Sequence, residues 1–290
     1  MSAAELVLRS DELEVVILPE LGARLHRLRA FGHDLLRTPE DAVAHRSDPF
    51  FWGAYVMAPW CNRIRPGEIE VEGRTVNLEA NFEDGSAIHG QVAASPWRPD
   101  ADGALRITGG DDGWPWSYEV VCRASVDGPE LALAYTVTNR SDSRMPAGVG
   151  LHPWFRRPVE VAIRAGMVYP VNADSPRMPE PVDAAYDLRA RRQLPPDIDA
   201  TWADLQTPRI ELAWPELGLA AWIEVDADRL LVAGASPADL DAVAVEPQTH
   251  GPDALRRLLS GEPDGLTVLR PNETLTLGLR VTVELARDLR

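Results

Sequence analysis

Residues 274–285 read Thr-Leu-Thr-Leu-Gly-Leu-Arg-Val-Thr-Val-Glu-Leu, with an apolar residue at every second position from Leu275 to Leu285. This period of two predicts one long β-strand with one buried face. The same alternation runs through residues 118–126 and 131–137. Shorter apolar runs predict six further strands, at Leu13–Leu18, Arg24–Ala30, Leu105–Thr108, Leu219–Val225, Leu230–Gly234 and Ala242–Glu246.

Turn and helix signals complete this pattern. Glu68–Val71 and Thr75–Leu78 flank Glu72-Gly73, which predicts a tight hairpin turn. Helical signal is scarce, and only Pro252–Leu259 predicts a short helix, with proline in its first turn. The 25 prolines and 21 glycines are spread along the chain and mark no linker. We therefore expect an all-β protein, a large β-sandwich that forms a single domain over residues 1–290.

Composition excludes several classes of function. The chain has 290 residues and a formal net charge of −16, and all 29 of its basic residues are arginine. Without lysine, neither Schiff-base nor phosphate-loop lysine chemistry is available. The acidic balance disfavours nucleic acid as a partner, because phosphate groups would be repelled. No stretch approaches the ~20 apolar residues of a membrane span, so no membrane partner is expected.

The cellular compartment is predicted from two weaker signals. The first residues lack the basic-then-apolar layout of a signal peptide. The two cysteines, Cys61 and Cys122, form no disulfide framework. We therefore expect a cytoplasmic protein whose cysteines are reduced.

The familiar catalytic motifs are absent from the sequence. No two of the six histidines have the i, i+4 spacing around a glutamate that is typical of zinc enzymes, and neither cysteine has a neighbouring cysteine. No Gly-x-Ser-x-Gly elbow, Gly-x-Gly-x-x-Gly turn or phosphate loop occurs. The sequence therefore predicts no metal site, and it gives no sign of nucleophilic, dinucleotide or nucleotide chemistry.

Two histidines lie where their neighbours constrain the backbone. His89 stands between an isoleucine and Gly90, and His152 follows a glycine-rich turn and precedes a proline and two aromatic residues. Each could be a core histidine bonded to a carbonyl, or an imidazole held at a site where the backbone passes closely. The indole of Trp154 would suit a sugar, because the C–H face of a sugar ring stacks on aromatic rings.

A glutamate and an Asn-Arg pair are also unusual. Glu246 follows the apolar run Ala242–Val245, so burial should raise its pKa and its basicity. We expect Pro247 to end that strand. A buried salt bridge is the alternative, but a carboxylate at a strand end favours a general base. Asn62-Arg63 follows Trp60, and taken alone it indicates a strand edge in solvent.

In this order, these segments resemble the aldose 1-epimerase family, also called the galactose mutarotases. The similarity runs from about Leu13 to Leu285, and five short motifs in sequence carry it. The segments similar to the family's motifs are Asn62-Arg63, Ile88-His89-Gly90, His152-Pro153-Trp154-Phe155, Asp199-Ala200-Thr201-Trp202 and Glu246-Pro247-Gln248.

The resemblance implies a β-supersandwich with its site in a cleft, and interconversion of the α and β anomers of a free monosaccharide without a cofactor. It implies that Glu246 takes the proton of the anomeric hydroxyl, that His152 gives a proton to the ring oxygen, and that His89 helps to polarise that oxygen. The ring would then open, rotate about C1–C2 and reclose. The substrate-binding residues that it implies are Arg63, Asn62, Asp199, Trp60, Trp154 and Gln248, of which Arg63 and Asp199 would form charge-assisted hydrogen bonds.

Departures from the family pattern leave the sugar open. The segment 150–155 reads Gly-Leu-His-Pro-Trp-Phe in place of a family Asn-His-Thr-Tyr-Phe, Gly90-Gln91 replaces a double glycine, and Cys61 replaces a small residue or a proline. The oligomeric state, monomer or homodimer, is equally open.

Two other functions compete with the mutarotase. One is a non-catalytic carbohydrate-binding or regulatory module, which would need no acid and base. The other is a hexose-6-phosphate 1-epimerase. The irregular segment Val171–Pro196 is expected to be a functional loop. The arginines that could hold a phosphate are Arg156, Arg157, Arg189, Arg191 and Arg192.

The proposed acid and base predict a bell-shaped pH profile. Glu246 should have a pKa above the ~4.3 of a free glutamate, which sets the acidic limb. His152, beside a carboxylate in an acidic protein, should have a pKa at or above ~6.5 unless burial outweighs the charges, and it would set the alkaline limb.

Overall fold

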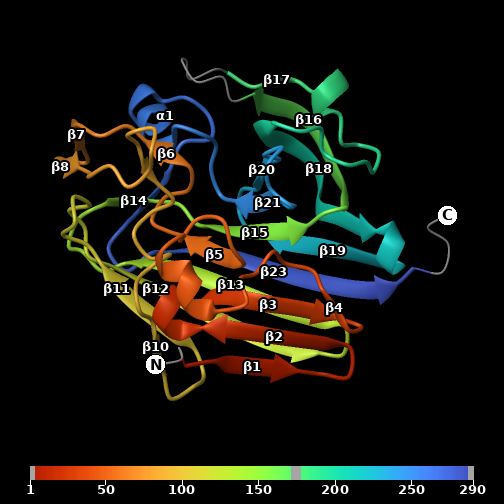
Figure 1. Ribbon diagram of the computed structural model, residues 1–290. Helices are drawn as coiled ribbons and strands as arrows, with labels where there is room; N and C mark the ends of the chain where they lie inside the picture. The colour runs from red at the N-terminus through yellow and green to blue at the C-terminus, as the bar shows by residue number, and fades with distance from the viewer. Residues whose placement is uncertain (1–3, 171–177, 287–290) are drawn as a thin grey trace.

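The computed structural model describes residues 4–170 and 178–286. Its main element is a curled antiparallel sheet of 17 strands that folds over into two layers (Figure 1). Helices are few among the described residues: the one α-helix is α1 (Ala254–Ser260), close to its predicted position, and four 3-10 turns accompany it. The all-β prediction is confirmed.

One layer carries most of the site. Its strands, in the order of their pairing, are β1 (Leu6–Arg9), β2 (Leu13–Leu18), β3 (Arg24–Ala30), β5 (Ala54–Met57), β15 (Gly150–Arg156), β21 (Ala242–Gln248), β20 (Leu231–Ala235) and the first part of β18 (Asp199–Trp214). On the other side of β18 follow β16 (Glu160–Pro170) and β17 (Glu180–Pro181).

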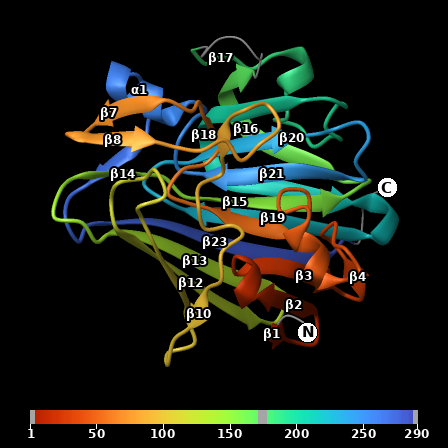
Figure 2. The ribbon, with the colours of Figure 1, turned by 60° about the vertical axis from the view of Figure 1, so that its left-hand side comes forward.

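The last part of β18 belongs to the second layer. From there the pairing runs through β19 (Leu219–Asp226), β23 (Thr274–Leu285), β13 (Glu130–Asn139), β12 (Tyr118–Asp127), β11 (Leu105–Gly109) and β10 (Arg98–Pro99). The remaining strands are β4 (His33–Asp34) on β3, and the pairs β6 (Arg63–Ile64) with β9 (Ala87–Ile88), β7 (Glu68–Val71) with β8 (Arg74–Asn77), and β14 (Met145–Ala147) with β22 (Thr267–Leu269). The β7–β8 hairpin and α1 lie at the same end of the molecule in both ribbon views (Figure 2).

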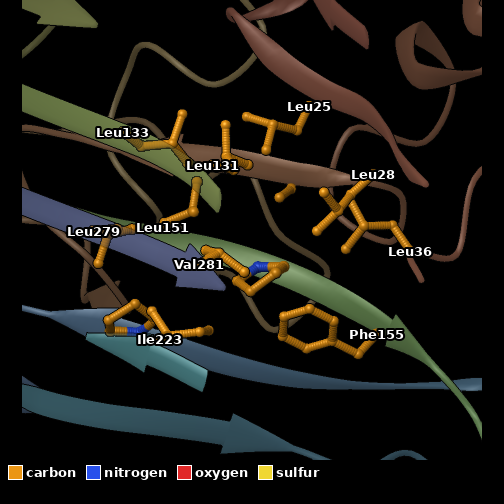
Figure 3. A pocket seen from close by; sticks show the side chains of 13 residues that line it. Leu25, Leu28, Leu36, Leu131, Leu133, Leu151, Phe155, Ile223, Leu279 and Val281 are labelled. Carbon is orange, nitrogen blue, oxygen red and sulfur yellow. The ribbon is translucent and has the colours of Figure 1, made fainter. Parts of the chain in front are cut away.

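The main core lies between the two layers. Leucine, isoleucine and valine side chains of β3, β13, β15, β19 and β23 meet there around an apolar cavity of about 20 Å³ (Figure 3). Alternation along β5 sends Ala54 and Val56 into this core and sends Tyr55 and Met57 to the opposite face. Because both faces of β5 and β21 are covered, every residue of these two strands is buried.

The strands with clear alternation were predicted well, and β23 has its predicted bounds. The prediction missed β15, β16 and β18. The 16-residue β18 has an exposed middle around Pro208, where it passes from one layer to the other, so its sequence shows no single period. Of the predicted loop Val171–Pro196, residues 171–177 lie outside the described part, and the rest contains β17 and a 3-10 turn.

The expectation that Pro247 ends its strand is wrong, because β21 continues to Gln248 and Pro247 lies opposite Val232 of β20. β15 pairs with β21 at Gly150–Gln248 and then again from Trp154–Ala244 onward, with a gap between these two points. The stretch between these points therefore needs no N–H donor, and a proline fits there. In the described part of the chain, no helix is both long and apolar enough to cross a bilayer.

Gly90 holds a close contact between two loops. Its φ is +75°, and a Cβ atom at this position would lie 2.0 Å from the carbonyl oxygen of Ala58. The same carbonyl accepts a hydrogen bond from the backbone N–H of Gln91 at 2.8 Å. Any side chain at position 90 would therefore push this loop away from the end of β5.

Replacement of Gly90 by alanine should destabilise the protein beyond the cost of its backbone angle. Gly85 has a similar φ of +79° with no atom within 4 Å of a built Cβ, so Gly85→Ala is the matched control. We expect a loss of about 1–2 kcal/mol in the free energy of unfolding for Gly85→Ala, and a further ~1–3 kcal/mol for Gly90→Ala. Urea unfolding measures both, and equal losses would show that the Ala58 contact imposes no constraint.

Candidate active site

His152 and Glu246 project from neighbouring strands, on the face turned away from the second layer. Nε2 of His152 lies 3.2 Å from Oε1 of Glu246, and only 6% of each side chain is exposed. On the other side of β15, Tyr55 of β5 pairs with His152. The two residues predicted to act as acid and base are therefore in direct contact, in the stretch where the β15–β21 pairing is interrupted.

Burial sets the protonation of this pair. Burial raises the pKa of Glu246 to about 8; the negative charge of Asp199 adds to the rise and Arg63 opposes it. Burial also lowers the pKa of His152, to about 3, and the positive charge of Arg24 acts in the same direction. Burial therefore favours the uncharged form of both groups, the protonated carboxyl of Glu246 and the neutral imidazole of His152. The expected pKa of His152, at or above ~6.5, was conditional on the charges outweighing burial, and here burial outweighs them.

His89 lies beside the pair in a fixed tautomer. Its ring Nδ1 accepts a hydrogen bond from the backbone N–H of Asn62 at 3.2 Å, and the backbone N–H of His89 donates to the Asn62 carbonyl at 3.0 Å. Burial, together with nearby His152 and Arg63, lowers its pKa well below the ordinary value, so the ring is neutral. The proton must then be on Nε2, which makes His89 a hydrogen-bond donor. Its ring meets that of His152 edge to face at 5.0 Å.

Asn62 shapes this loop from within. Its φ is +55°, and its Oδ1 accepts the backbone N–H of Arg63 at 2.8 Å. The residue is 8% exposed. The contacts of Asn62 thus orient His89 and Arg63, and the substrate contact that the resemblance implied for Asn62 stays a prediction.

The rim of the site is charged and more open. Nε of Arg63 donates to Oδ2 of Asp84 at 2.7 Å, and its Nη1 lies 3.9 Å from Oδ2 of Asp199. The exposed fractions of the Arg63, Asp84 and Asp199 side chains are 34%, 41% and 43%, against 6% for the pair below. The sequence placed Arg63 and Asp199 in one site, and the structure brings them together.

A cover segment, Pro49–Trp52, closes one side. All four of its carbonyls accept hydrogen bonds from side chains. Arg24 donates to the carbonyls of Pro49 and Trp52. Trp154 donates to the carbonyl of Phe50, and Arg37 donates to that of Phe51. The ring of Phe50 packs against the aromatic rings around the pair. This segment keeps water from the pair and so contributes to both pKa shifts.

Three predicted substrate contacts lie inside the protein. Trp60 is 2% exposed, donates its indole N–H to the Ala87 carbonyl and packs on Trp114 in the main core, so it cannot stack on a sugar. Trp154 is 2% exposed and lies against the His152 ring at 5.1 Å, so it supports the imidazole. Gln248 is fully buried and donates to the His250 carbonyl at 2.8 Å.

Sequence reasoning missed two residues of the site, Tyr55 and Asp84. Tyr55 reaches the site because β5 pairs with β15, and Asp84 reaches it because a turn held by Ser86 brings its carboxylate to Arg63. Neither residue lies in a recognisable motif. Only the strand order and the turn geometry reveal them.

The arginines considered as phosphate ligands have other partners. Nε of Arg156 donates to the Leu36 carbonyl and Nε of Arg157 to the Leu240 carbonyl. Three more line an open pocket around residues 184–192 and have the following partners: Arg189 pairs with Asp187, Arg191 with Glu160, and Arg192 with the Ala184 carbonyl. None of these contacts involves the buried pair or its rim.

The chain is similar to known proteins in sequence and in fold. The sequence profile of the family described as aldose 1-epimerase matches residues 5–282. An uncharacterised Escherichia coli K12 protein, YphB, is 23% identical over 248 residues, which are 79% of this chain and 83% of that protein.

Solved structures share the fold. A galactose 1-epimerase from Lactobacillus acidophilus NCFM superposes with a TM-score of 0.79 at 17% identity, covering 98% of this chain and 95% of that one. A galactose mutarotase-like protein from Clostridium acetobutylicum gives 0.81 at 17% identity, covering 96% and 94%. The C. elegans homologue of GalM/aldose epimerase gives 0.82 at 15% identity, covering 99% and 100%.

Proposed function

Because the chain belongs to the aldose 1-epimerase family, we propose that it is a cofactor-independent aldose 1-epimerase, or mutarotase, acting on a free monosaccharide. The observation that carries this proposal is the buried contact of 3.2 Å between Nε2 of His152 and Oε1 of Glu246. A binding module needs no acid and base, and burying two titratable groups costs stability, a cost that catalysis would explain and binding alone would not.

The single proton of the pair is sufficient for the reaction. Transfer across the contact converts neutral His152 and protonated Glu246 into imidazolium and carboxylate, with no change in the proton count. Glu246 then removes the proton of the anomeric O1 hydroxyl while His152 protonates the ring oxygen. The bond between C1 and the ring oxygen breaks with its electrons going to that oxygen, and a C1–O1 double bond forms.

Ring opening returns the pair to its resting form, a protonated Glu246 and a neutral His152. This form is also the one needed for closure, in which Glu246 gives its proton to O1 and His152 takes one from the ring hydroxyl. Rotation about C1–C2 before closure delivers the other anomer. The cycle is therefore complete without proton exchange with water, which suits a pair that is 6% exposed.

The surroundings favour a neutral, polyhydroxylated substrate. The Nε2–H of His89 is a donor for the ring oxygen, and the charges of Arg63 and Asp199 suit hydroxyl groups. The rim holds two carboxylates, Asp84 and Asp199, against one guanidinium. That balance disfavours a doubly charged phosphate, so a free aldose is the better substrate than a hexose 6-phosphate.

Anomer exchange measured by NMR tests this function. The parent should accelerate exchange for one or more sugars in a panel of free aldoses, and less so for the matching 6-phosphates. Glu246→Gln and His152→Gln should each lose about 10²–10⁴-fold while remaining folded, because general acid–base catalysis contributes that much. A sugar that binds without accelerated exchange would identify a binding module, and faster exchange of 6-phosphates would identify the phosphosugar enzyme.

The pH profile should follow the proton count of the pair. Activity requires one proton on the pair, so kcat should fall on the alkaline side as Glu246 loses that proton, near pH 8. On the acidic side kcat should fall only when His152 gains a second proton, well below the ordinary histidine pKa because burial disfavours its charge. A kcat profile with its acidic limb at or above ~6.5 would contradict this assignment.

A further inference from the structure

Four buried side chains form one row across four neighbouring strands. Leu25 of β3 pairs with Ala54 of β5, so Arg24 lies opposite Tyr55. Tyr55 in turn pairs with His152 of β15. Glu246 of β21 completes the row through its contact with His152. The strand order thus places Arg24 and His152 on opposite sides of Tyr55.

The members of the row touch in sequence. The guanidinium carbon of Arg24 lies 4.7 Å from the centre of the Tyr55 ring. The rings of Tyr55 and His152 stack with their centres 4.6 Å apart and their planes at 22°. Arg24 is 1% exposed, Tyr55 is fully buried, and His152 is 4% exposed. These contacts therefore lie in the interior of the protein.

Stacking replaces the hydrogen bond that orients the imidazole in many histidine sites. Such a bond is usually made by the ring nitrogen that does not face the reaction. Here Nε2 faces Glu246, and Nδ1 forms no hydrogen bond with another described residue; the only backbone group that acts on the ring is that of His152 itself. The ring plane is thus set by its aromatic neighbours. The Tyr55 ring is nearly parallel to it, whereas Trp154 is tilted by 39°.

Arg24 keeps Tyr55 from moving away. Its Nη1 donates to the Trp52 carbonyl at 2.8 Å and its Nη2 to the Pro49 carbonyl at 2.5 Å, which ties the guanidinium to the cover segment. The Tyr55 hydroxyl has no hydrogen-bond partner in the described part of the chain. Among the described residues, Tyr55 is therefore held by packing on its ring and not by a hydrogen bond from its hydroxyl.

We propose that Tyr55, backed by Arg24, is a positioning residue that fixes the plane of the His152 imidazole so that Nε2 faces Glu246. The proposal rests on the proposed function, because the orientation matters only if His152 transfers a proton. The aromatic ring of Tyr55 should be sufficient, and its hydroxyl should be dispensable.

Two substitutions and one control test this role. Tyr55→Phe keeps the ring and removes the hydroxyl, whereas Tyr55→Leu removes the ring. Val56→Ala is the control, because Val56 is the neighbouring residue of β5 and faces the main core. We expect Tyr55→Leu to lower kcat about 10²-fold with little change in KM, as for a misaligned catalytic group. Tyr55→Phe should keep the parental kcat, and Val56→Ala should lower stability without lowering kcat.

A second readout is independent of turnover. The imidazole C–H proton resonances of His152, assigned with His152→Gln, should be displaced by the stacked ring in the parent and in Tyr55→Phe. In Tyr55→Leu they should lose this displacement. Unchanged His152 resonances in Tyr55→Leu would overturn the proposal, and so would parental kcat in that variant. A loss in Tyr55→Phe equal to that in Tyr55→Leu would also overturn it, by assigning the role to the hydroxyl.

The proposed function and the role of Tyr55 can fail separately. A parent protein without anomer exchange for any sugar in the panel would contradict the proposed function. The resonances of His152 would still decide whether the Tyr55 ring fixes the imidazole.

Discussion

The contact between His152 and Glu246 is the constraint around which this protein is built. Two titratable groups in a dry interior are tolerated only if they stay neutral or pair closely. Here they do both, because one proton satisfies both partners across 3.2 Å. Burial raises the pKa of the carboxyl and lowers the pKa of the imidazole, so it favours the neutral form of both partners.

Several distant parts of the chain are needed to keep this contact dry. The second layer, with β13, β19 and β23, packs against the opposite face of these strands and closes their rear side (Figure 3). The cover segment Pro49–Trp52 closes one side, and the loop from Asn62 to His89 lies across another. The rim around Arg63 is charged and half-exposed, so the site becomes more charged and more exposed from the buried pair outward. This gradient suits a substrate whose hydroxyls face solvent and whose reacting atoms do not.

Local patterns in the sequence predicted the strands that keep one period, such as β12, β13 and β23. They could not predict β18, because that strand changes layers in its middle. The motif resemblance located His89, His152, Asp199 and Glu246. It could not give the order of the pKa values, because that order depends on how deeply the fold buries the two groups.

The sequence also could not predict which residues become neighbours across adjacent strands. Tyr55 and Arg24 enter the site only through the register of β3, β5 and β15, which no short motif encodes. Trp60, an aromatic residue next to a site motif, was predicted to contact the substrate. It is instead a core residue, packed on Trp114. Residues adjacent in sequence to a catalytic motif are thus weaker candidates than residues adjacent to it across the sheet.

The central claim is that the resting pair carries its one proton on Glu246. The infrared difference spectrum between the parent and Glu246→Gln at neutral pH tests this claim most directly, because a protonated carboxyl group and a carboxylate absorb in separate regions. The account predicts that the parent shows a protonated-carboxyl band, shifted in D₂O, that the variant lacks. A difference spectrum with only carboxylate bands would place the proton elsewhere and contradict the account.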